Sequence, residues 1–192
     1  MRVLQVRKLT DEKWLNLFEA SFEHNGHQGR WLFASRKADP KEAGQRADAV
    51  IIVPVLLAGG QPPRLVLVRE FRVAVNGYIY GFPAGLLEKG EPIDECIRRE
   101  LAEETGLELV RVKRLSGGLY SSAGLTDEAV VVAFVDVRAV DGIGPQLEES
   151  EDLEVVLLDH DGVRRLCDDP AAHFDARCWM ALYLYEQLGK LV

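Results

Sequence analysis

The chain has 192 residues, of which 47% are hydrophobic and 28% charged, with a net charge of −8 at neutral pH. This composition is typical of a globular domain with a real core, and the acidic balance argues against a nucleic-acid partner held by broad electrostatics. No apolar run approaches the roughly 18 residues of a membrane span, so no membrane partner is expected. Since residues 1–8 also lack the apolar stretch of a signal peptide, we expect a cytoplasmic protein.

The N-terminal part of the chain predicts a small antiparallel β segment. Residues 14–24 and 30–36 are rich in aromatic side chains and partly alternate, and turn-forming residues 25–29 lie between them. This pattern favours a hairpin, with a short helix around residues 14–18 as the alternative. An aromatic side chain in such a hairpin more often packs than binds, although Trp31 or Phe22 would suit stacking on a base.

From residue 49 onward, strand and helix patterns are mixed. Strands are predicted, in chain order, at residues 49–57, 64–71, 110–115, 128–137 and 153–158. Helices are predicted at residues 92–105, 161–167 and 171–188. Several neighbouring strands are joined by short turns, so a mixed sheet covered by helices fits better than a purely parallel one. The polar linker at residues 37–48 separates an N-terminal β segment, residues 1–45, from a main domain, residues 46–192.

Three glutamates share one face of the helix predicted at residues 92–105. Glu100, Glu103 and Glu104 stand at positions i, i+3 and i+4, where like charges repel. They also lie in the C-terminal half of the helix, where the helix dipole disfavours anions. A run of charges is usually only a solvated helix face, but a hard divalent cation such as Mg²⁺ would remove both penalties.

The surrounding residues extend this pattern into a long motif. The segment from Gly85 to Leu107 matches Gly-x5-Glu-x7-Arg-Glu-U-x-Glu-Glu-x-Gly-U, where U is a bulky aliphatic residue. In this it resembles the Nudix hydrolase family. The resemblance implies an α/β fold, an α/β/α sandwich with a mixed sheet. It also implies hydrolysis of the pyrophosphate bond of a nucleoside diphosphate linked to another group.

The resemblance assigns metal chemistry to several residues of the motif. Glu100 and Glu104 would be the main ligands of Mg²⁺, with Mn²⁺ as a possible substitute. Glu103 would be a further ligand or would orient the catalytic water. The backbone carbonyl of Ala84 is expected as an additional metal ligand.

Three further motif residues have expected supporting roles. Arg99 would hold the glutamates in place through charge-assisted hydrogen bonds. Gly85 would let its loop approach the metal. Glu91 is expected to begin the helix, where its carboxylate would interact with free backbone N–H groups.

Segments outside the motif resemble the ADP-ribose and nucleotide-sugar pyrophosphatase branch. They are Arg69–Arg72, Gly77–Gly85, Tyr120–Glu128 and the acidic loop Glu149–Leu153. The segment Tyr120–Glu128 departs from that branch, because Ala123 occupies the position where many of its members have proline.

This resemblance suggests the remaining site residues. A glutamate of the acidic loop is a candidate general base or metal ligand, Glu151 being the first choice and Glu149 the second. Arg72, Arg36 and Gly124 are the candidate contacts to a small nucleotide substrate. An arginine at a strand end, however, more often forms a surface ion pair.

ADP-ribose is the leading substrate expected from this resemblance. The alternatives within the enzyme class are GDP-mannose, UDP-glucose, FAD, NADH and dinucleoside polyphosphates. A different class is a Nudix-fold sensor that binds a nucleotide without cutting it, but a sensor would be expected to lose the catalytic glutamates. In the resembled branch the N-terminal segment packs against a second subunit and helps to form the substrate pocket, so a homodimer is expected.

Overall fold

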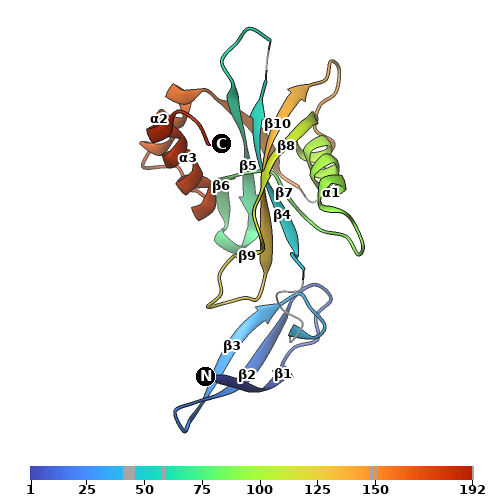
Figure 1. Ribbon diagram of the computed structural model, residues 1–192, viewed down its shortest axis with the longest axis vertical. Helices are drawn as coiled ribbons and strands as arrows, with labels where there is room; N and C mark the ends of the chain where they lie inside the picture. Colours follow the sequence, from blue (N-terminus) through green and yellow to red (C-terminus); the bar gives the residue numbers. More distant parts are fainter. Residues whose placement is uncertain (41–45, 58, 148, 150, 192) are drawn as a thin grey trace. The chain divides into compact units, whose positions relative to one another are not determined.

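The computed structural model describes residues 1–40, 46–57, 59–147, 149 and 151–191, and it divides into two compact units (Figure 1). The N-terminal unit comprises Met1–Asp48 and Gly117–Val131, and the main unit comprises Ala49–Ser116 and Val132–Val192. The boundary predicted between residues 45 and 46 falls at the edge of residues 41–45, which lie outside the described residues.

The N-terminal unit contains a three-stranded antiparallel sheet in the order β1-β2-β3. Strand β1 is Arg2–Lys8, β2 is Asn16–His24 and β3 is His27–Ser35. The predicted hairpin is therefore confirmed as β2–β3, and the helical alternative around residues 14–18 is wrong. Asn25 and Gly26 form its tight turn, both with positive φ, which matches the twist of the flanking strands. Strand β1 was not predicted, because it has no clear apolar face.

The main sheet follows the order β11-β5-β4-β10-β8, and three short strands add to it: β6 pairs with β5, β7 with β4 and β9 with β10. The bounds are β4 Ala49–Leu56, β5 Arg64–Arg72, β6 Gly77–Gly81, β7 Ala84–Leu86, β8 Leu107–Leu115, β9 Leu119–Tyr120, β10 Ala129–Ala139 and β11 Leu153–Leu158.

The main sheet is mixed, as predicted. Strands β10 and β8, and likewise β11 and β5, run antiparallel. Strands β4 and β10 run in the same direction, because Asp48 N donates to Ala129 O while Leu57 N, further along both strands, donates to Val137 O. Strands β7 and β9 were not predicted because three and two residues are too few to show an alternating pattern. Strand β6 was not predicted because its apolar residues do not alternate with polar ones.

Helices cover both faces of this sheet. Figure 1 shows helix α1, Ile93–Glu100, on one side of it, and helices α2, His160–Cys167, and α3, Ala176–Leu188, on the other. The Nudix-type α/β/α sandwich is thereby confirmed. Helix α3 begins later than the predicted residue 171, because the Asp175 side chain caps it by accepting hydrogen bonds from the first backbone N–H groups.

The predicted helix at residues 92–105 is present, but its last turn is not an α-helix. After α1, Leu101–Thr105 form a π-helical turn, labelled η3, and Gly106 ends it with a φ of 67°. π-Helical turns within longer helices are frequent at functional sites. Here the turn carries two of the three glutamates that the sequence singled out, Glu103 and Glu104.

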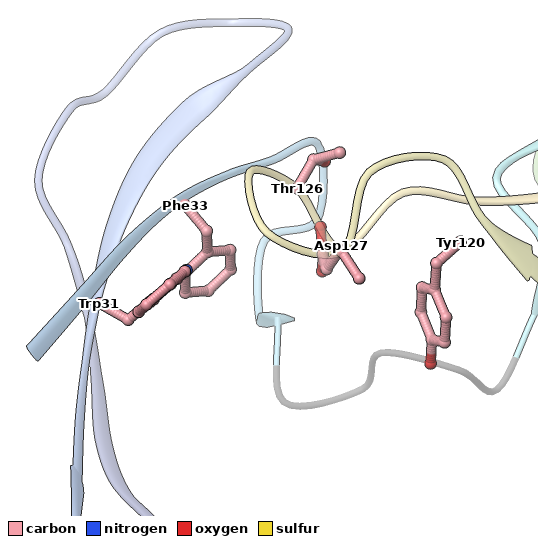
Figure 2. Close-up of a pocket in the computed structure, with 6 residues that line it drawn as sticks. Trp31, Phe33, Tyr120, Thr126 and Asp127 are labelled. Atoms are coloured by element: carbon pink, nitrogen blue, oxygen red, sulfur yellow. The ribbon is translucent and has the colours of Figure 1, made fainter. Parts of the chain in front are cut away.

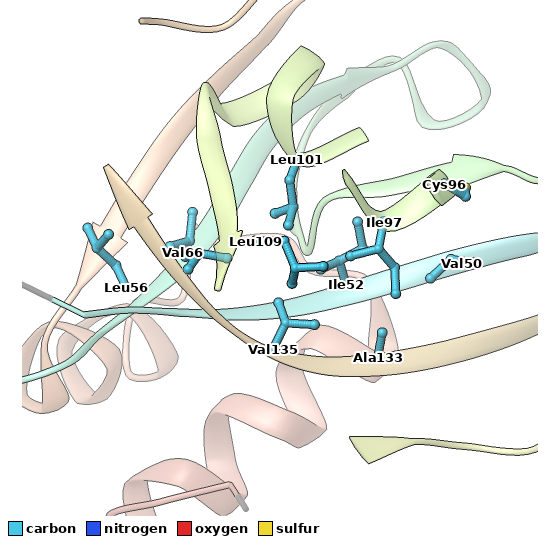
Figure 3. Packing of buried hydrophobic residues seen from close by; sticks show 11 residues of the cluster. Val50, Ile52, Leu56, Val66, Cys96, Ile97, Leu101, Leu109, Ala133 and Val135 are labelled. Atoms are coloured by element: carbon cyan, nitrogen blue, oxygen red, sulfur yellow. The ribbon is translucent and has the colours of Figure 1, made fainter. Parts of the chain in front are cut away.

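Helix α1 and η3 are fixed to the sheet by a buried apolar cluster (Figure 3). Ile97 and Leu101 are fully buried against side chains of the central strands, including Ile52 of β4 and Val135 of β10. Burial of each such aliphatic side chain contributes about 2 kcal/mol. The orientation of the helix, and with it the face that carries the glutamates, is therefore determined by the core.

Candidate active site

The two innermost motif glutamates are almost fully buried. Glu100 ends α1 and Glu104 lies in η3, with exposed fractions of 8% and 7%. Glu103 is more exposed, and its backbone carbonyl accepts a hydrogen bond from Gln146 N at 2.7 Å. Two buried carboxylates so close together are costly unless charge or hydrogen bonds compensate them.

Strand β7 supplies the second wall of the site. Ala84 N donates a hydrogen bond to Glu104 Oε2 at 3.2 Å. The backbone of Gly85 packs directly on the Glu100 carboxylate, and a methyl group at this position would overlap that carboxylate. Gly85 therefore permits a close approach of β7 to the Glu100 carboxylate, whereas its expected approach to the metal stays a prediction.

Arg99 connects three carboxylates of the motif. Its Nη1 donates to Glu100 Oε1 at 2.6 Å and to Glu103 Oε2 at 3.2 Å. Its Nε and Nη2 donate to Glu91 at 3.0 and 3.2 Å, and Nη2 also donates to Leu86 O. These contacts, chiefly the one with Glu91, raise the pKa of Arg99, so the guanidinium is charged at every practical pH.

The expected role of Glu91 at the start of the helix is not observed. The N-cap position of α1 is Pro92, which has no side-chain cap. The Glu91 carboxylate instead accepts from Arg99 and from Glu88 N. The hydrogen bond with Arg99 is the largest cause of a lowered Glu91 pKa. Glu91 therefore orients Arg99 across the length of the helix, a contact between residues eight apart.

Two further acidic residues, Glu70 and Glu151, contribute to the site from strand β5 and from the loop before β11, at the edge of the sheet. Glu70 of β5 is paired in register with Leu153 of β11, and Phe71 N donates to Asp152 O at 2.9 Å. This pairing places Asp152 and Leu153, at the end of the acidic loop, beside the end of β5. Burial raises the pKa of Glu70, the charge of Arg72 lowers it and the charge of Glu151 raises it further.

The pKa of Glu104 is raised to about 8, and the charges of three neighbouring carboxylates contribute to this shift. Burial is the largest cause, followed by the charge of Glu100; the hydrogen bond from Ala84 opposes the shift, and the charges of Glu70 and Glu151 add to it. Burial also raises the pKa of Glu100, against the effect of Arg99. The main unit thus concentrates four carboxylates, which favours a proton or a cation at Glu104.

The donor set fits a hard divalent cation, but the side chains are not arranged as a complete coordination shell. Among the described residues, no group of three acidic, histidine or cysteine side chains has its ligand atoms gathered around one point. One reason is visible, since Glu100 Oε1 is engaged by Arg99. The donors are all oxygen atoms, and a divalent cation such as Mg²⁺ or Mn²⁺ would compensate the charges of Glu100, Glu70 and Glu151 around Glu104.

The sequence did not indicate the part that Glu70 plays. Its carboxylate is half-buried and electrostatically coupled to Glu104 and Glu151. The available signal was an acidic side chain at the end of a strand that leads into the motif. What the sequence did not show was the pairing of β5 with β11, which brings the acidic loop to that strand end.

The three candidate substrate contacts lie in different parts of the chain. Arg72, in the main unit, forms an ion pair with Glu70 at 2.9 Å. Arg36, in the N-terminal unit, lies 3.6 Å from Glu128. Gly124 belongs to the same unit, and its carbonyl accepts a hydrogen bond from Trp31 Nε1 at 3.1 Å. Of the two base candidates, Glu149 is exposed and Glu151 half-buried, while Ser150 between them is outside the described residues.

The N-terminal unit has a pocket of its own, with a volume of about 240 Å³ (Figure 2). Aromatic side chains give it flat apolar walls suited to a planar ring. Phe22 does not line it, since its ring packs over Gly29 across the hairpin, in agreement with a packing role. The lining residues are Trp31, Phe33, Tyr120, Ala123, Thr126 and Asp127.

Comparison with known proteins agrees with this geometry. The model of the NUDIX domain matches residues 45–182. ADP-ribose pyrophosphatase of Saccharomyces cerevisiae is 30% identical over 155 residues, covering 78% of this chain and 65% of that protein. ADP-sugar pyrophosphatase of Mus musculus is 33% identical over 158 residues, covering 78% of this chain and 69% of that protein. The chain belongs to the Nudix family, whose members generally use divalent metal ions.

A solved structure supports the fold independently. The crystal structure of an ADP compounds hydrolase superposes with a TM-score of 0.69, covering 100% of this chain and 96% of that chain at 21% identity. The matched segments span only about two thirds of the yeast and mouse relatives. In the part of the chain that the structure describes, no helix combines the length and apolarity needed to cross a membrane.

Proposed function

We propose that this protein hydrolyses the pyrophosphate bond of ADP-ribose, giving AMP and ribose 5-phosphate, with Mg²⁺ as its cofactor. The observation that carries the proposal is the concentration of carboxylates around Glu104, because the charges of Glu100, Glu70 and Glu151 there would stabilise a bound cation. The names of the yeast and mouse relatives support the substrate class. Mn²⁺ is the substitute metal, since it accepts the same oxygen ligands.

The roles proposed for the motif residues follow from their contacts. Glu104 and Glu100 hold the metal ion, together with the Ala84 carbonyl, and Glu103 is a further ligand or orients the catalytic water. When bound, Mg²⁺ neutralises phosphate charge and acidifies a bound water. Arg99 holds Glu100 and Glu103 in place through its hydrogen bonds.

The general base is proposed to be Glu151, which accepts the proton of the water that attacks phosphorus. Its support is the electrostatic coupling of Glu151 with Glu70, Glu100 and Glu104. Glu149, two residues earlier on the same loop, is the second candidate. The proton leaves the water as its oxygen forms the new bond to phosphorus, and the bridging oxygen departs with the leaving monophosphate.

Substrate contacts through Arg72, Arg36 and Gly124 remain proposals. The same holds for an N-terminal segment, residues 1–45, that serves dimerisation and the substrate pocket. The cytoplasmic location expected from the sequence also stays a prediction.

A substrate panel with Mg²⁺ tests the proposed function. ADP-ribose, ADP-glucose, GDP-mannose, UDP-glucose, FAD, NADH and a dinucleoside polyphosphate are incubated with the full chain, and products are separated by chromatography. The proposal predicts AMP and ribose 5-phosphate from ADP-ribose, at a kcat/KM well above that of the other compounds. If another compound has a greater kcat/KM, that compound replaces ADP-ribose as the proposed substrate. No turnover of any member would favour the sensor alternative.

A second substrate class is favoured by one comparison. The mouse relative is named an ADP-sugar pyrophosphatase, and its identity to this chain, 33%, is higher than the 30% of the yeast relative. Comparable turnover of ADP-ribose and ADP-glucose would support that broader class. The metal site and the bond that is cut would be unchanged.

A further inference from the structure

Tyr78 of strand β6 is bound to the last residue before strand β11. Its hydroxyl donates a hydrogen bond to Asp152 Oδ2 at 2.5 Å. The Tyr78 ring is held by two further contacts: the Arg69 guanidinium lies 4.2 Å from its centroid, and the Phe71 ring meets it edge-on with centroids 5.3 Å apart. Asp152 is also bound through its backbone, because Phe71 N donates to its carbonyl at 2.9 Å. Tyr78 therefore helps to hold residue 152 in one place.

The side chains that surround the Tyr78 ring lie on one face of the sheet. Phe71 is paired in register with Tyr78, and residues paired across antiparallel strands point to the same side. Arg69 is paired in the same way with Glu154, with which it forms an ion pair at 3.2 Å. Successive side chains of a strand point to opposite faces, so Glu70, between Arg69 and Phe71, points to the other face.

Glu151 belongs to the face of Glu70. Glu70 is paired with Leu153, and the hydrogen bonds between the two chain segments extend to the carbonyl of Asp152, so the chain is still extended there. Glu151 stands two positions before Leu153, which puts both on the same side. In agreement, the charge of Glu151 raises the pKa of Glu70 and that of Glu104. The carboxylates of Glu151 and Asp152 therefore lie on opposite faces.

The other end of the acidic loop is bound to the turn that carries the motif glutamates. Gln146 N donates to Glu103 O at 2.7 Å, within η3. Residues 147–151 connect this hydrogen bond to Asp152. Because one end of this segment is attached to η3, the position of Glu151 relative to the glutamates of η3 depends on where Asp152 is held at the other end.

We propose, on the basis of the proposed function in which Glu151 is the general base, that Tyr78 is a positioning residue that acts through Asp152 to hold Glu151 beside the motif glutamates. Tyr78 lies on the face of the sheet opposite Glu70, so it acts on the rate through the position of Glu151 and not through the bond that is cut. A general base must lie within hydrogen-bond reach of the attacking water, and a small displacement of Glu151 therefore lowers the rate.

Steady-state kinetics with the best substrate of the panel are the first test. Tyr78→Phe removes the hydroxyl and keeps the ring, so kcat should fall about 10-fold while KM changes less than about 2-fold. Asp152→Asn keeps an acceptor for the Tyr78 hydroxyl and should retain most of the kcat, whereas Asp152→Ala should lose as much as Tyr78→Phe. Tyr80→Phe, the same change on the same face of β6, where the ring packs against Phe174, is the matched control. An unchanged kcat in Tyr78→Phe, or an equal loss in Tyr80→Phe, overturns the proposal.

Combination with Glu151→Gln tests whether Tyr78 acts through Glu151. Tyr78→Phe should lower kcat in the wild type and have no further effect in Glu151→Gln, because the two changes then remove the same contribution. A purely structural role of Tyr78 would lower kcat by the same factor in both backgrounds, and that result would overturn the proposal.

Hydrogen–deuterium exchange of the full chain tests the hold on Glu151 without any substrate. The amides of residues 151–153 should exchange at least about 3-fold faster in Tyr78→Phe than in the wild type or in Tyr80→Phe, because loss of the hydrogen bond makes local opening easier. Unchanged exchange overturns the proposal, whatever the substrate is. If the wild type cuts no compound of the panel and Tyr78→Phe still speeds the exchange, the proposed function fails while the hold of Tyr78 on residue 151 stands.

Discussion

The carboxylate of Glu91 accepts hydrogen bonds from both Nε and Nη2 of Arg99, at 3.0 and 3.2 Å. This forked pair holds the guanidinium in one orientation, with Nη1 directed at Glu100. Glu91, which precedes the helix, thus fixes the position of the Arg99 guanidinium beside the glutamates near the end of the helix. The position of the Glu100 carboxylate is consequently linked to the charge of Glu91.

Glu91→Gln tests this link. The amide keeps the shape of the side chain but weakens the charge-assisted pair, so Arg99 is expected to turn further toward Glu100. Loss of an outer contact of this kind predicts a roughly 10-fold lower kcat. Stability should fall by about 1 kcal/mol. Steady-state kinetics and thermal unfolding measure both effects. Glu95→Gln, on the exposed side of the same helix, should change neither, and equal effects of the two variants would contradict the role of Glu91.

The pKa of about 8 at Glu104 predicts a pH-dependent stability of the metal-free protein. Because the carboxyl binds its proton more tightly in the folded state, its contribution to stability is complete below the unfolded pKa near 4.5. That contribution is lost as the pH rises through about 8. Glu104→Gln should therefore unfold at a higher temperature than the wild type at pH 9 in EDTA, and show a much smaller difference at pH 4. The opposite order at pH 9 would show that Glu104 is not a buried acid.

The same variant should be inactive. Since the amide is a poor ligand for Mg²⁺, Glu104→Gln is expected to lose most of the turnover while the substrate still binds, as measured by calorimetry. Mg²⁺ should raise the unfolding temperature of the wild type more at pH 8 than at pH 5, because at low pH it must displace a proton from Glu104. The variant should lack this pH-dependent gain. Near-normal turnover would exclude Glu104 as a metal ligand.

Thr105 offers a test of the π-helical turn. Its buried hydroxyl donates to Leu101 O at 2.5 Å and accepts from Leu107 N at 3.2 Å, so it joins the start of η3 to the start of β8. Thr105→Val keeps the shape and removes both hydrogen bonds, which should cost about 1–2 kcal/mol. If the turn positions Glu104, Mn²⁺ affinity should also fall, and Thr105→Ser should restore it. A stability loss with unchanged Mn²⁺ binding by calorimetry would limit Thr105 to a structural role.

The two base candidates are distinguished by paired variants. Glu151→Gln should lower kcat about 100-fold, within the range for general bases, and flatten the acidic limb of the pH–rate profile. Glu149→Gln is the matched change two residues away and should leave both unaltered. The reverse result would assign the base to Glu149. Unchanged profiles in both variants would place it elsewhere.

Much of the fold was predictable because its signals are local. The long strands and helices have the periodicity of their classes, and Gly106 ends the motif helix where the pattern placed it. Strands β7 and β9 were too short to show a period, β6 does not alternate, and β1 lacks a clear apolar face. The sequence also did not show which side of α3 is exposed, because a helix that is apolar on both sides gives no sign of which side is buried.

The sequence alone determined the family, the helix that carries the chemistry and the identity of its glutamates, because spacing along one helix places side chains on one face without any distant contact. The tertiary structure decided the part of each carboxylate. Glu91 became the partner of Arg99 because the chain folds back beside the helix. Glu70 joined the acidic group because β11 pairs with β5, and Glu104 gained its raised pKa because the core buries the turn that carries it. Burial and pairing between distant segments set these charges, and neither is encoded in the local pattern.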